Sequence, residues 1–300
     1  MGGPAGGATG GPATIGELLT PAELLVLSRA RLLLRRPRLP FPGAHLSRRA
    51  GTSLEFADHR PYQPGDDLRL VDWALYARHR KLMTKVFSRE VEAPLYLLVD
   101  VSRSMELGGK FSFAVRLCAA LCFLAFRGGD RFGVYPFRDQ PGVWGKPRRG
   151  RIALARTFSE LGRLIPQGKT NFSATFSRWA EKFREPGMCV VASDFLAPGF
   201  QEGLAILRHA RHAVAAVQIL APEDLTPPVL GEIRLLDVEE GRGRPMVVGR
   251  AAQRAYQEAL HRWNKSLAEA CRELGVAQFL FAADSSPVQA ALVLARRWRP

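Results

Sequence analysis

Apolar and polar residues follow different patterns on either side of Pro94. Before it, apolar residues recur at helical spacing over residues 15–34, with Thr20 and Pro21 placed as the N-cap and the first helical residue. Residues 44–92 mix short strand-like pieces with turn-forming residues. Because this segment has too few periodic apolar positions to form a core alone, we expect it to pack on the domain that follows.

After Pro94 the pattern predicts strands and helices in alternation. Strands are expected at residues 95–99, 131–137, 188–192, 213–220 and 276–282. Helices are expected at residues 111–126, 152–164, 172–183, 201–210 and 251–274, and again after residue 285. Because buried strands that alternate with helices form mostly parallel sheets with helices on both faces, the sequence predicts an α/β fold.

These patterns divide the chain into three parts. Residues 1–12 are a glycine-rich leader of low complexity, which we expect to be disordered. Residues 13–92 are expected to form a small N-terminal α+β segment. Residues 93–300 are expected to form the α/β domain, with a hairpin inserted at about residues 230–249.

Composition excludes several classes of protein. Of 300 residues, 47% are hydrophobic and 24% charged, which is typical of globular proteins and not of disordered or fibrous ones. The longest unbroken apolar run, residues 117–126, has about half the length of a membrane span, so we expect a buried helix there and no membrane span. Four cysteines without paired spacing, and an N-terminus unlike a secretory signal, predict a reduced, cytoplasmic protein.

Charge is the unusual feature of the composition. The 43 Lys and Arg residues outnumber the 28 Asp and Glu residues, which gives a formal net charge of +15. Residues 141–185 alone carry ten basic and three acidic residues. This stretch could be a solvated arginine-rich surface or a patch that attracts nucleic acid or an acidic partner, and composition leaves both interpretations open.

Hydroxyl and carboxylate side chains follow two of the predicted strands. In the run Asp100-Val101-Ser102-Arg103-Ser104, alternate side chains of an extended segment point the same way. Another strand ends in Ser193-Asp194, and the run Gly168-Lys169-Thr170-Asn171 opens a helix. Because ligands bind at the carboxyl ends of parallel strands, five oxygen-bearing side chains are expected to gather there: Asp100, Ser102, Ser104, Thr170 and Asp194.

This donor set predicts a divalent metal site. Oxygen ligands without His or Cys suit Mg²⁺ or Mn²⁺ better than zinc or copper. Two carboxylates balance the charge of such an ion, and uncharged hydroxyls leave it able to bind one carboxylate from outside. Taken singly, Ser104 and Thr170 could instead be helix N-caps and Asp194 a turn residue, so the prediction depends on the convergence of all five.

Two motifs, in this order, resemble known families. Residues 55–73 (EFADHRPYQPGDDLRLVDW) are similar to the signature of the bacterial domain-of-unknown-function family fifty-eight. The five oxygen-bearing residues resemble the metal-ion-dependent adhesion site of von Willebrand factor type A domains. The resemblance covers roughly residues 44–285. It implies a Rossmann-like sheet whose metal is held directly by Ser102, Ser104 and Thr170, and partly through water by Asp100 and Asp194.

The resemblance also implies a function. Members of that family usually accompany a MoxR-type AAA+ ATPase and are thought to act with it in chaperone-like maturation of other proteins. We therefore expect a non-enzymatic, metal-dependent protein–protein interaction module. The ATPase or a client protein would supply an acidic side chain to the metal. Many relatives carry transmembrane helices near the N-terminus, and this sequence shows none there.

Other functions fit the sequence less well. The main alternative is a nucleic-acid-binding protein that uses residues 141–185. In that case the affinity for nucleic acid would depend on the salt concentration and not on a divalent metal. No base-reading module accompanies these arginines, so nucleic acid is not expected as a partner. A metal-dependent hydrolase is a third possibility. A phosphatase of the haloacid dehalogenase type, however, needs an acid where this chain has Ser102.

Two further motifs resemble ligand-binding sites. Gly168-Lys169-Thr170 looks like the end of a Walker A loop, but the first glycine of that motif would fall at Arg163, so ATP binding through it is not expected. His209 and His212 are three residues apart without cysteine or acidic partners. We expect them at an exposed helix end and not on a metal.

Overall fold

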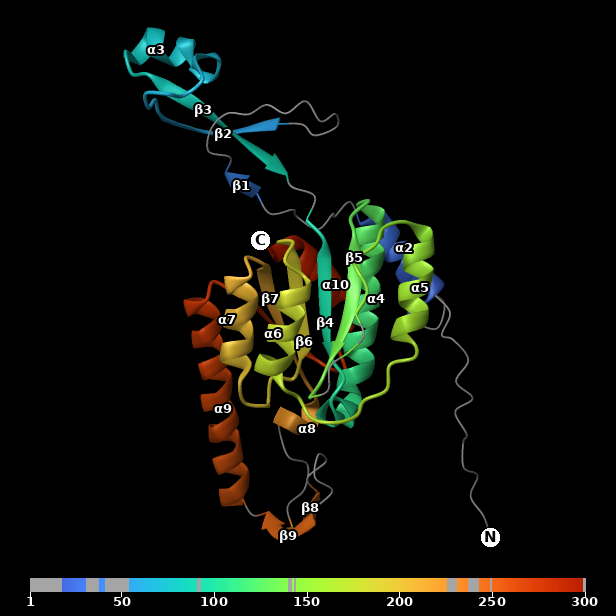
Figure 1. The fold of residues 1–300 in the computed structure, drawn as a ribbon. Helices are drawn as coiled ribbons and strands as arrows, with labels where there is room; N and C mark the ends of the chain where they lie inside the picture. Colours follow the sequence, from blue (N-terminus) through green and yellow to red (C-terminus); the bar gives the residue numbers. More distant parts are fainter. Residues whose placement is uncertain are drawn as a thin grey trace. The chain divides into compact units, whose positions relative to one another are not determined.

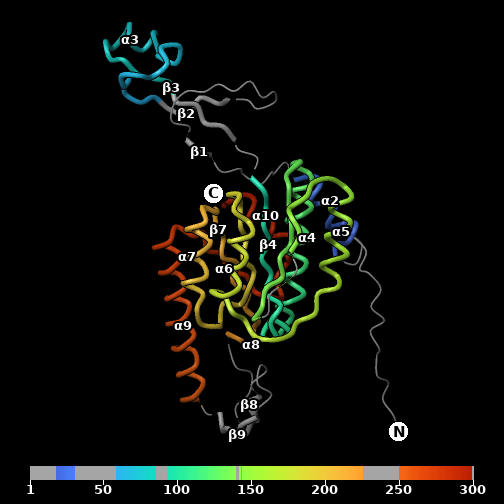
Figure 2. Tube along the Cα trace, viewed as in Figure 1, coloured from blue at the N-terminus to red at the C-terminus, as the bar shows by residue number. Residues whose placement is uncertain are grey.

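The computed structural model describes residues 18–30, 38–40, 54–90, 93–139, 142, 144–225, 231–236, 243–248 and 250–298. Figure 2 follows the Cα trace from the blue N-terminal part to the red C-terminal part. These residues belong to two compact units. One comprises residues 18–30 and 93–298, and the other comprises residues 38–90. The predicted leader at residues 1–12 and the tip of the predicted hairpin lie outside the described residues.

The larger unit is the predicted α/β domain (Figure 1). Its parallel strands are β4 (Leu95–Asp100), β5 (Phe132–Phe137), β6 (Met188–Ser193), β7 (Ala213–Leu220) and β10 (Ala277–Ala282). Its helices are α2 (Pro21–Arg29), the 3-10 segment η2 (Arg103–Gly109), α4 (Lys110–Arg127), α5 (Arg151–Leu161), α6 (Phe172–Lys182), α7 (Phe200–His209), α8 (Pro222–Leu225), α9 (Arg250–Glu273) and α10 (Pro287–Arg297). β8 (Gly231–Leu236) and β9 (Gly243–Val248) pair antiparallel as a hairpin within the predicted insertion.

The five parallel strands are ordered β10-β7-β6-β4-β5. From β4 the chain crosses to β5 on one side, whereas from β6 it crosses to β7 on the other. The order therefore reverses between β4 and β6, which is where loops diverge and ligands bind in open α/β sheets. Asp100 ends β4 and Ser193 ends β6, so both lie at this point.

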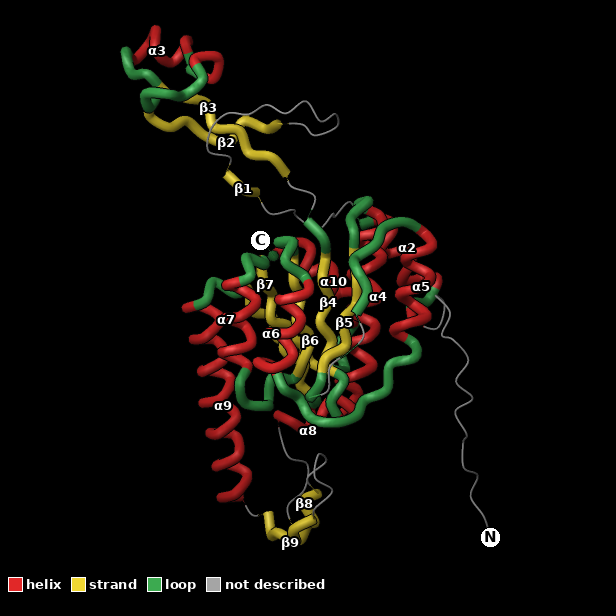
Figure 3. The backbone as a smooth tube through the Cα atoms, viewed as in Figure 1, coloured by secondary structure: helices red, strands yellow, loops and turns green. Residues whose placement is uncertain are grey.

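Helices cover both faces of the sheet, as predicted (Figure 3). Alternate residues of each strand enter opposite cores, because successive side chains of a strand point to opposite faces. Leu97 and Val99 of β4 pack with α4, α5 and α10 on one face. Tyr96 and Leu98 pack with α6 and α7 on the other, where Tyr96 contacts Trp179 edge to face. The Rossmann-like α/β fold is thus confirmed.

The apolar run at residues 117–126 lies within α4, a central helix of the first core. Residues 103–127 have the length and hydropathy of a membrane-crossing helix, but 67% of the tested window is buried inside the protein. Leu117, Cys118 and Leu121 are fully buried against the sheet and α10. This burial matches the expected core helix.

The smaller unit is a three-stranded antiparallel sheet with strand order β1-β3-β2. Its strands are β1 (Arg38–Pro40), β2 (Leu54–Pro61) and β3 (Met83–Glu90), and it also holds the 3-10 turn η1 (Leu68–Leu70) and the helix α3 (Trp73–His79). Asp66 anchors the turn by accepting hydrogen bonds from Gln63 N (3.0 Å) and Thr84 Oγ1 (3.2 Å). Asp72 caps α3 through Leu75 N (3.0 Å) and lies 2.8 Å from His59 Nε2.

The division between the units differs from the predicted segment 13–92 in one respect. The helix α2 belongs to the α/β unit, where its Leu27 is fully buried in the core beside α4 and α10. Arg116 of α4 holds it by donating to the Leu18 carbonyl (3.2 Å) and to Glu23 (2.6 Å). The sequence pattern shows that α2 is amphipathic but not which element covers its apolar face.

Candidate metal site at the carboxyl edge of the sheet

Asp100 is the centre of a hydrogen-bonded cluster at the end of β4. Its side chain is fully buried. Oδ1 accepts from the Ser102 N–H at 2.9 Å, and Oδ2 accepts from Ser193 Oγ at 2.6 Å and Thr170 Oγ1 at 3.0 Å. A carboxylate from one strand, a hydroxyl from the next and a hydroxyl from a third segment therefore meet at one point.

The two serines that follow Asp100 complete this cluster. Ser102 Oγ lies 3.0 Å from Ser104 Oγ, and Ser102 is fully buried. Ser102 is the N-cap residue of η2, yet its side chain makes no capping hydrogen bond. The hydroxyl groups of the Ser102–Ser104 pair consequently face each other instead of satisfying the helix backbone.

The Thr170 segment is fixed against the loop after β4 by main-chain hydrogen bonds. Gln167 N donates to the Val101 carbonyl at 2.7 Å, and Arg103 N donates to the Gly168 carbonyl at 3.1 Å. Gly168 has φ +75°, a left-handed conformation that glycine adopts without strain. Asn171, and not Thr170, caps α6 through Ala174 N (3.1 Å), so Thr170 is free to donate to Asp100.

Asp194, the fifth predicted residue, is held differently. Its Oδ1 accepts from Leu196 N at 3.1 Å, and its Oδ2 lies 3.0 Å from Lys110 Nζ. Lys110 is also 3.0 Å from Asp224 of α8, so one buried ammonium bridges two carboxylates. The structure thus joins Asp100, Ser102, Ser104 and Thr170 by hydrogen bonds, and it places Asp194 nearby without a hydrogen bond to them.

The charges of the cluster perturb one another. Burial raises the pKa of Asp100 to about 6, and repulsion from Asp194 adds to this rise. Burial disfavours the charged form of Lys110, but Asp194 and Asp224 outweigh it and raise the pKa of the ammonium above its usual value. Asp100 is therefore the carboxylate for which no side-chain cation compensates among the residues around it.

The chemistry of this donor set fits a hard divalent cation. One buried carboxylate has hydroxyls of Thr170, Ser193 and the Ser102–Ser104 pair around it, and no nitrogen or sulfur ligand. No three His, Cys, Asp or Glu side chains come together for a metal anywhere in the described part of the chain. A site here would therefore depend on hydroxyl ligands.

Sequence reasoning missed two residues at this edge of the sheet, and it misplaced a histidine elsewhere in the fold. Ser193 was seen at the strand end but not assigned to the site, although it makes the 2.6 Å bond to Asp100. Lys110 carried no signal, since a lysine at a helix start usually faces water. His212, expected to be exposed, is fully buried: its Nδ1 accepts from Gly187 N at 3.2 Å, and its Nε2 lies 3.1 Å from the Phe183 carbonyl.

Residues 58–266 match the family described as "Protein of unknown function DUF58". Uncharacterised proteins of Mycobacterium tuberculosis and Mycobacterium bovis are each 30% identical over 243 residues, covering 78% of this chain and 76% of theirs. Among solved structures, the conserved hypothetical protein BatB of Bacteroides thetaiotaomicron aligns with 15% identity and a TM-score of 0.41, covering 68% of this chain and 96% of that one. An aerotolerance-related membrane protein of Bacteroides fragilis aligns with 18% identity and a TM-score of 0.37, covering 61% and 98%.

Proposed function

This chain belongs to the DUF58 family, and from that premise we propose that it is a non-enzymatic, metal-dependent protein–protein interaction module. In this proposal Ser102, Ser104 and Thr170 hold Mg²⁺ or Mn²⁺ directly, and Asp100 and Asp194 act partly through water. The proposed arrangement resembles the metal-ion-dependent adhesion site of von Willebrand factor type A domains. When bound, the metal supplies a positive centre that attracts a carboxylate of the partner.

The single observation that carries this proposal is the environment of Asp100. It is a fully buried carboxylate at the switch point of a parallel sheet, surrounded by hydroxyls from three chain segments. Burying an ionised group without a counter-charge is costly, so such a group is either protonated or paired with a cation. A divalent ion provides that pairing and uses the hydroxyls that point at the same place.

In this proposal the cluster binds a partner and does not catalyse a reaction. Ser102 Oγ, the candidate nucleophile, has Ser104 Oγ as its neighbour at 3.0 Å. An activated serine requires a base within hydrogen-bond reach. Among the described residues, His212 is buried against Phe183 and Gly187, and His209 bonds its own helix carbonyl at Ala205. Neither histidine serves Ser102 as a base.

We propose a MoxR-type AAA+ ATPase, or a client protein processed with it, as the partner that supplies the acidic side chain. The net charge of +15 favours an acidic partner of either kind. In this proposal the protein works in the cytoplasm in chaperone-like assembly or maturation of other proteins. The metal would connect the edge of the sheet to a carboxylate on the partner's surface.

Binding to a purified MoxR-type ATPase from the same organism tests this function. Biolayer interferometry in 5-fold steps of Mg²⁺, and again in EDTA, compares the wild type with Asp100→Ala. The proposal expects binding in Mg²⁺ that is lost in EDTA and in the variant. Asp284→Ala is the matched control, because Asp284 is an exposed aspartate that follows another strand, β10. Equal binding by wild type and Asp100→Ala, or binding that ignores EDTA, would contradict the proposal.

A further inference from the structure

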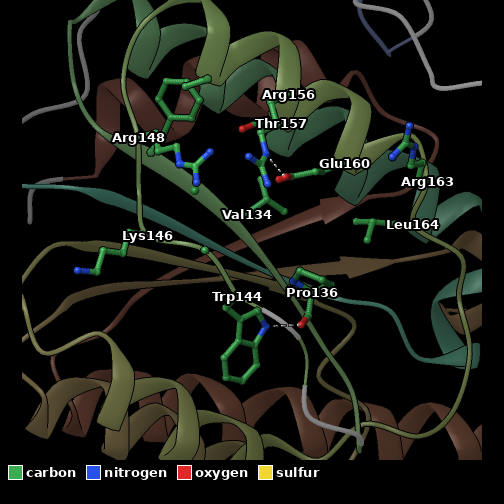
Figure 4. Close-up of a pocket in the computed structure, with 14 residues that line it drawn as sticks. Val134, Pro136, Trp144, Lys146, Arg148, Arg156, Thr157, Glu160, Arg163 and Leu164 are labelled. Carbon is green, nitrogen blue, oxygen red and sulfur yellow. Dashed lines mark hydrogen bonds and ion pairs between the residues drawn. The ribbon is translucent and has the colours of Figure 1, made fainter.

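A cavity of about 430 Å³ lies along the outer edge of β5 (Figure 4). Its walls are β5, the segment 144–148 and the helix α5, and it shares no lining residue with the candidate metal site. Phe132, Val134, Pro136 and Leu164 provide apolar lining. Cavities of roughly 300–1,000 Å³ with apolar walls and a few polar groups are typical of small-molecule sites.

The edge of β5 presents a main-chain donor and acceptor to this cavity. Alternate residues of a strand direct their N–H and C=O groups to the same side. Phe132 directs both away from β4 and pairs with Arg148 (2.8 and 2.9 Å), and the Pro136 carbonyl accepts from Trp144 Nε1 at 3.1 Å. Val134, which lies between them, therefore directs its N–H and C=O to the same side. These two groups have no hydrogen-bond partner among the described residues.

Basic side chains surround this main-chain pair. Lys146, Arg148, Arg156 and Arg163 line the cavity with a single acidic residue, Glu160, which pairs with Arg156 at 2.8 Å. In Figure 4 the guanidinium groups of Arg148 and Arg156 extend toward Val134. Arg148 makes no ion pair with any described acidic residue. The cavity therefore favours an anion.

We propose that this cavity binds a mononucleotide. The flat base would lie against the apolar lining, and its edge, which carries a donor beside an acceptor, would pair with the Val134 main chain. The phosphate would lie near Arg148 and Arg156, which suit phosphate because guanidinium groups bind it with paired hydrogen bonds. This site is independent of the candidate metal site and of any partner bound there.

Two other occupants fit the cavity less well. A peptide that extends the sheet needs a row of free edge groups, but Phe132 and Pro136 already use theirs, which leaves Val134 alone. Inorganic phosphate could bind the arginines but would use neither the apolar lining nor the Val134 pair. A ligand with a base and a phosphate uses all three features.

Isothermal titration calorimetry with ADP, in EDTA to exclude the metal site, tests this proposal. Val134→Pro removes the N–H that faces the cavity and no bond to β4, because proline is accepted on an edge strand when its nitrogen faces outward. Losing this donor should weaken ADP binding about tenfold. Val134→Ala keeps the N–H and removes only part of the apolar lining, so it should weaken binding clearly less than Val134→Pro.

A second pair of variants tests the anion subsite. Arg148→Ala combined with Arg156→Ala should weaken ADP binding by about tenfold or more. Arg178→Ala combined with Arg254→Ala removes the same charge from exposed positions on α6 and α9 and should leave binding unchanged. Circular dichroism confirms that each variant folds. If Val134→Pro does not fold, the Arg148 and Arg156 variant decides the test. Three results would overturn the proposal: no ADP binding, ADP binding no tighter than inorganic phosphate, or equal losses in both arginine pairs.

Discussion

The ammonium of Lys110 lies 3.0 Å from the carboxylate of Asp194, and both side chains are only 1% exposed. This pair fixes the strand end that carries the candidate metal site to the start of α4. Removing one partner of a buried ion pair leaves an uncompensated charge, at a cost of about 3–5 kcal/mol. The contact is therefore important for the stability of this edge of the sheet.

Lys110→Met should consequently lower the free energy of unfolding by about 3–5 kcal/mol. Urea unfolding at neutral pH measures this change. Lys265→Met is the control, because Lys265 makes only an exposed i,i+4 contact with Glu269 at 3.9 Å and should cost less than about 0.5 kcal/mol. If the two variants were equally stable, the Lys110 bridge would not support this edge.

Asp100 should be a source of instability in the metal-free protein. Its folded pKa of about 6 lies above the ordinary value of 3.8, so the protonated form stabilises the fold. That contribution is complete below about pH 3.8 and is lost as pH rises through about 6. Asp100→Asn should therefore raise the free energy of unfolding in EDTA at pH 7.5 by about 1–3 kcal/mol. Urea unfolding at pH 7.5 and pH 5 gives the comparison, and a destabilised variant at pH 7.5 would refute this account of the charge.

His212 should make the protein sensitive to acid. Burial lowers the pKa of His212 below 6.5, because a buried ring loses the water that would solvate its charged form, although the Phe183 carbonyl that faces Nε2 opposes this shift. The neutral form therefore stabilises the fold fully above about pH 6.5, and this stability falls as pH drops below that value.

His212→Asn keeps an acceptor for Gly187 but cannot take up a proton. Between pH 7.5 and 5.5 the wild type should lose about 1 kcal/mol more of its unfolding free energy than this variant. Comparing the variant with the wild type cancels the opposite contribution of Asp100 over the same range. Parallel pH profiles for the two proteins would mean that His212 does not titrate in this way.

Substituting two adjacent glycines of η2 should show how much a steric contact costs beyond backbone strain. Gly108 and Gly109 both have positive φ, +60° and +79°. A Cβ on Gly108 would lie 2.2 Å from Ala221 Cβ, whereas a Cβ on Gly109 would meet nothing within 4 Å. Gly109→Ala should cost about 1 kcal/mol, and Gly108→Ala should cost clearly more. Thermal unfolding of both variants tests this order, and equal costs would exclude the contact with Ala221.

The sequence predicted the fold well because its strongest signals are local. Buried apolar runs located β4, β6 and β7 to within one residue of their observed ends, and the long apolar pattern located α9. The alternation of strands and helices then left few ways to arrange a parallel sheet. The packing of α2 against α4 could not be predicted from the local sequence pattern, because it depends on contacts between residues about 90 positions apart.

The candidate site was predictable only in part. The alternation Asp100-x-Ser102-x-Ser104 put these side chains on one edge, and the position of Thr170 before a helix brought it there too. The Lys110 bridge could not be foreseen, since α8 reaches it from more than 110 residues away. His212 was misplaced because a histidine near a helix end usually lies in water, whereas here the rings of Tyr96 and Trp179 pack against it.

The central claim is that the oxygen-bearing side chains around Asp100 hold a divalent cation. The most direct measurement is an anomalous difference map from a crystal of this protein soaked in Mn²⁺, collected beside an Asp100→Ala crystal. We predict a peak at the end of β4 within ligand distance of Ser102, Ser104 and Thr170, and no peak in the variant. A wild-type map without density at this edge, or with Thr170 turned away from Asp100, would contradict the claim.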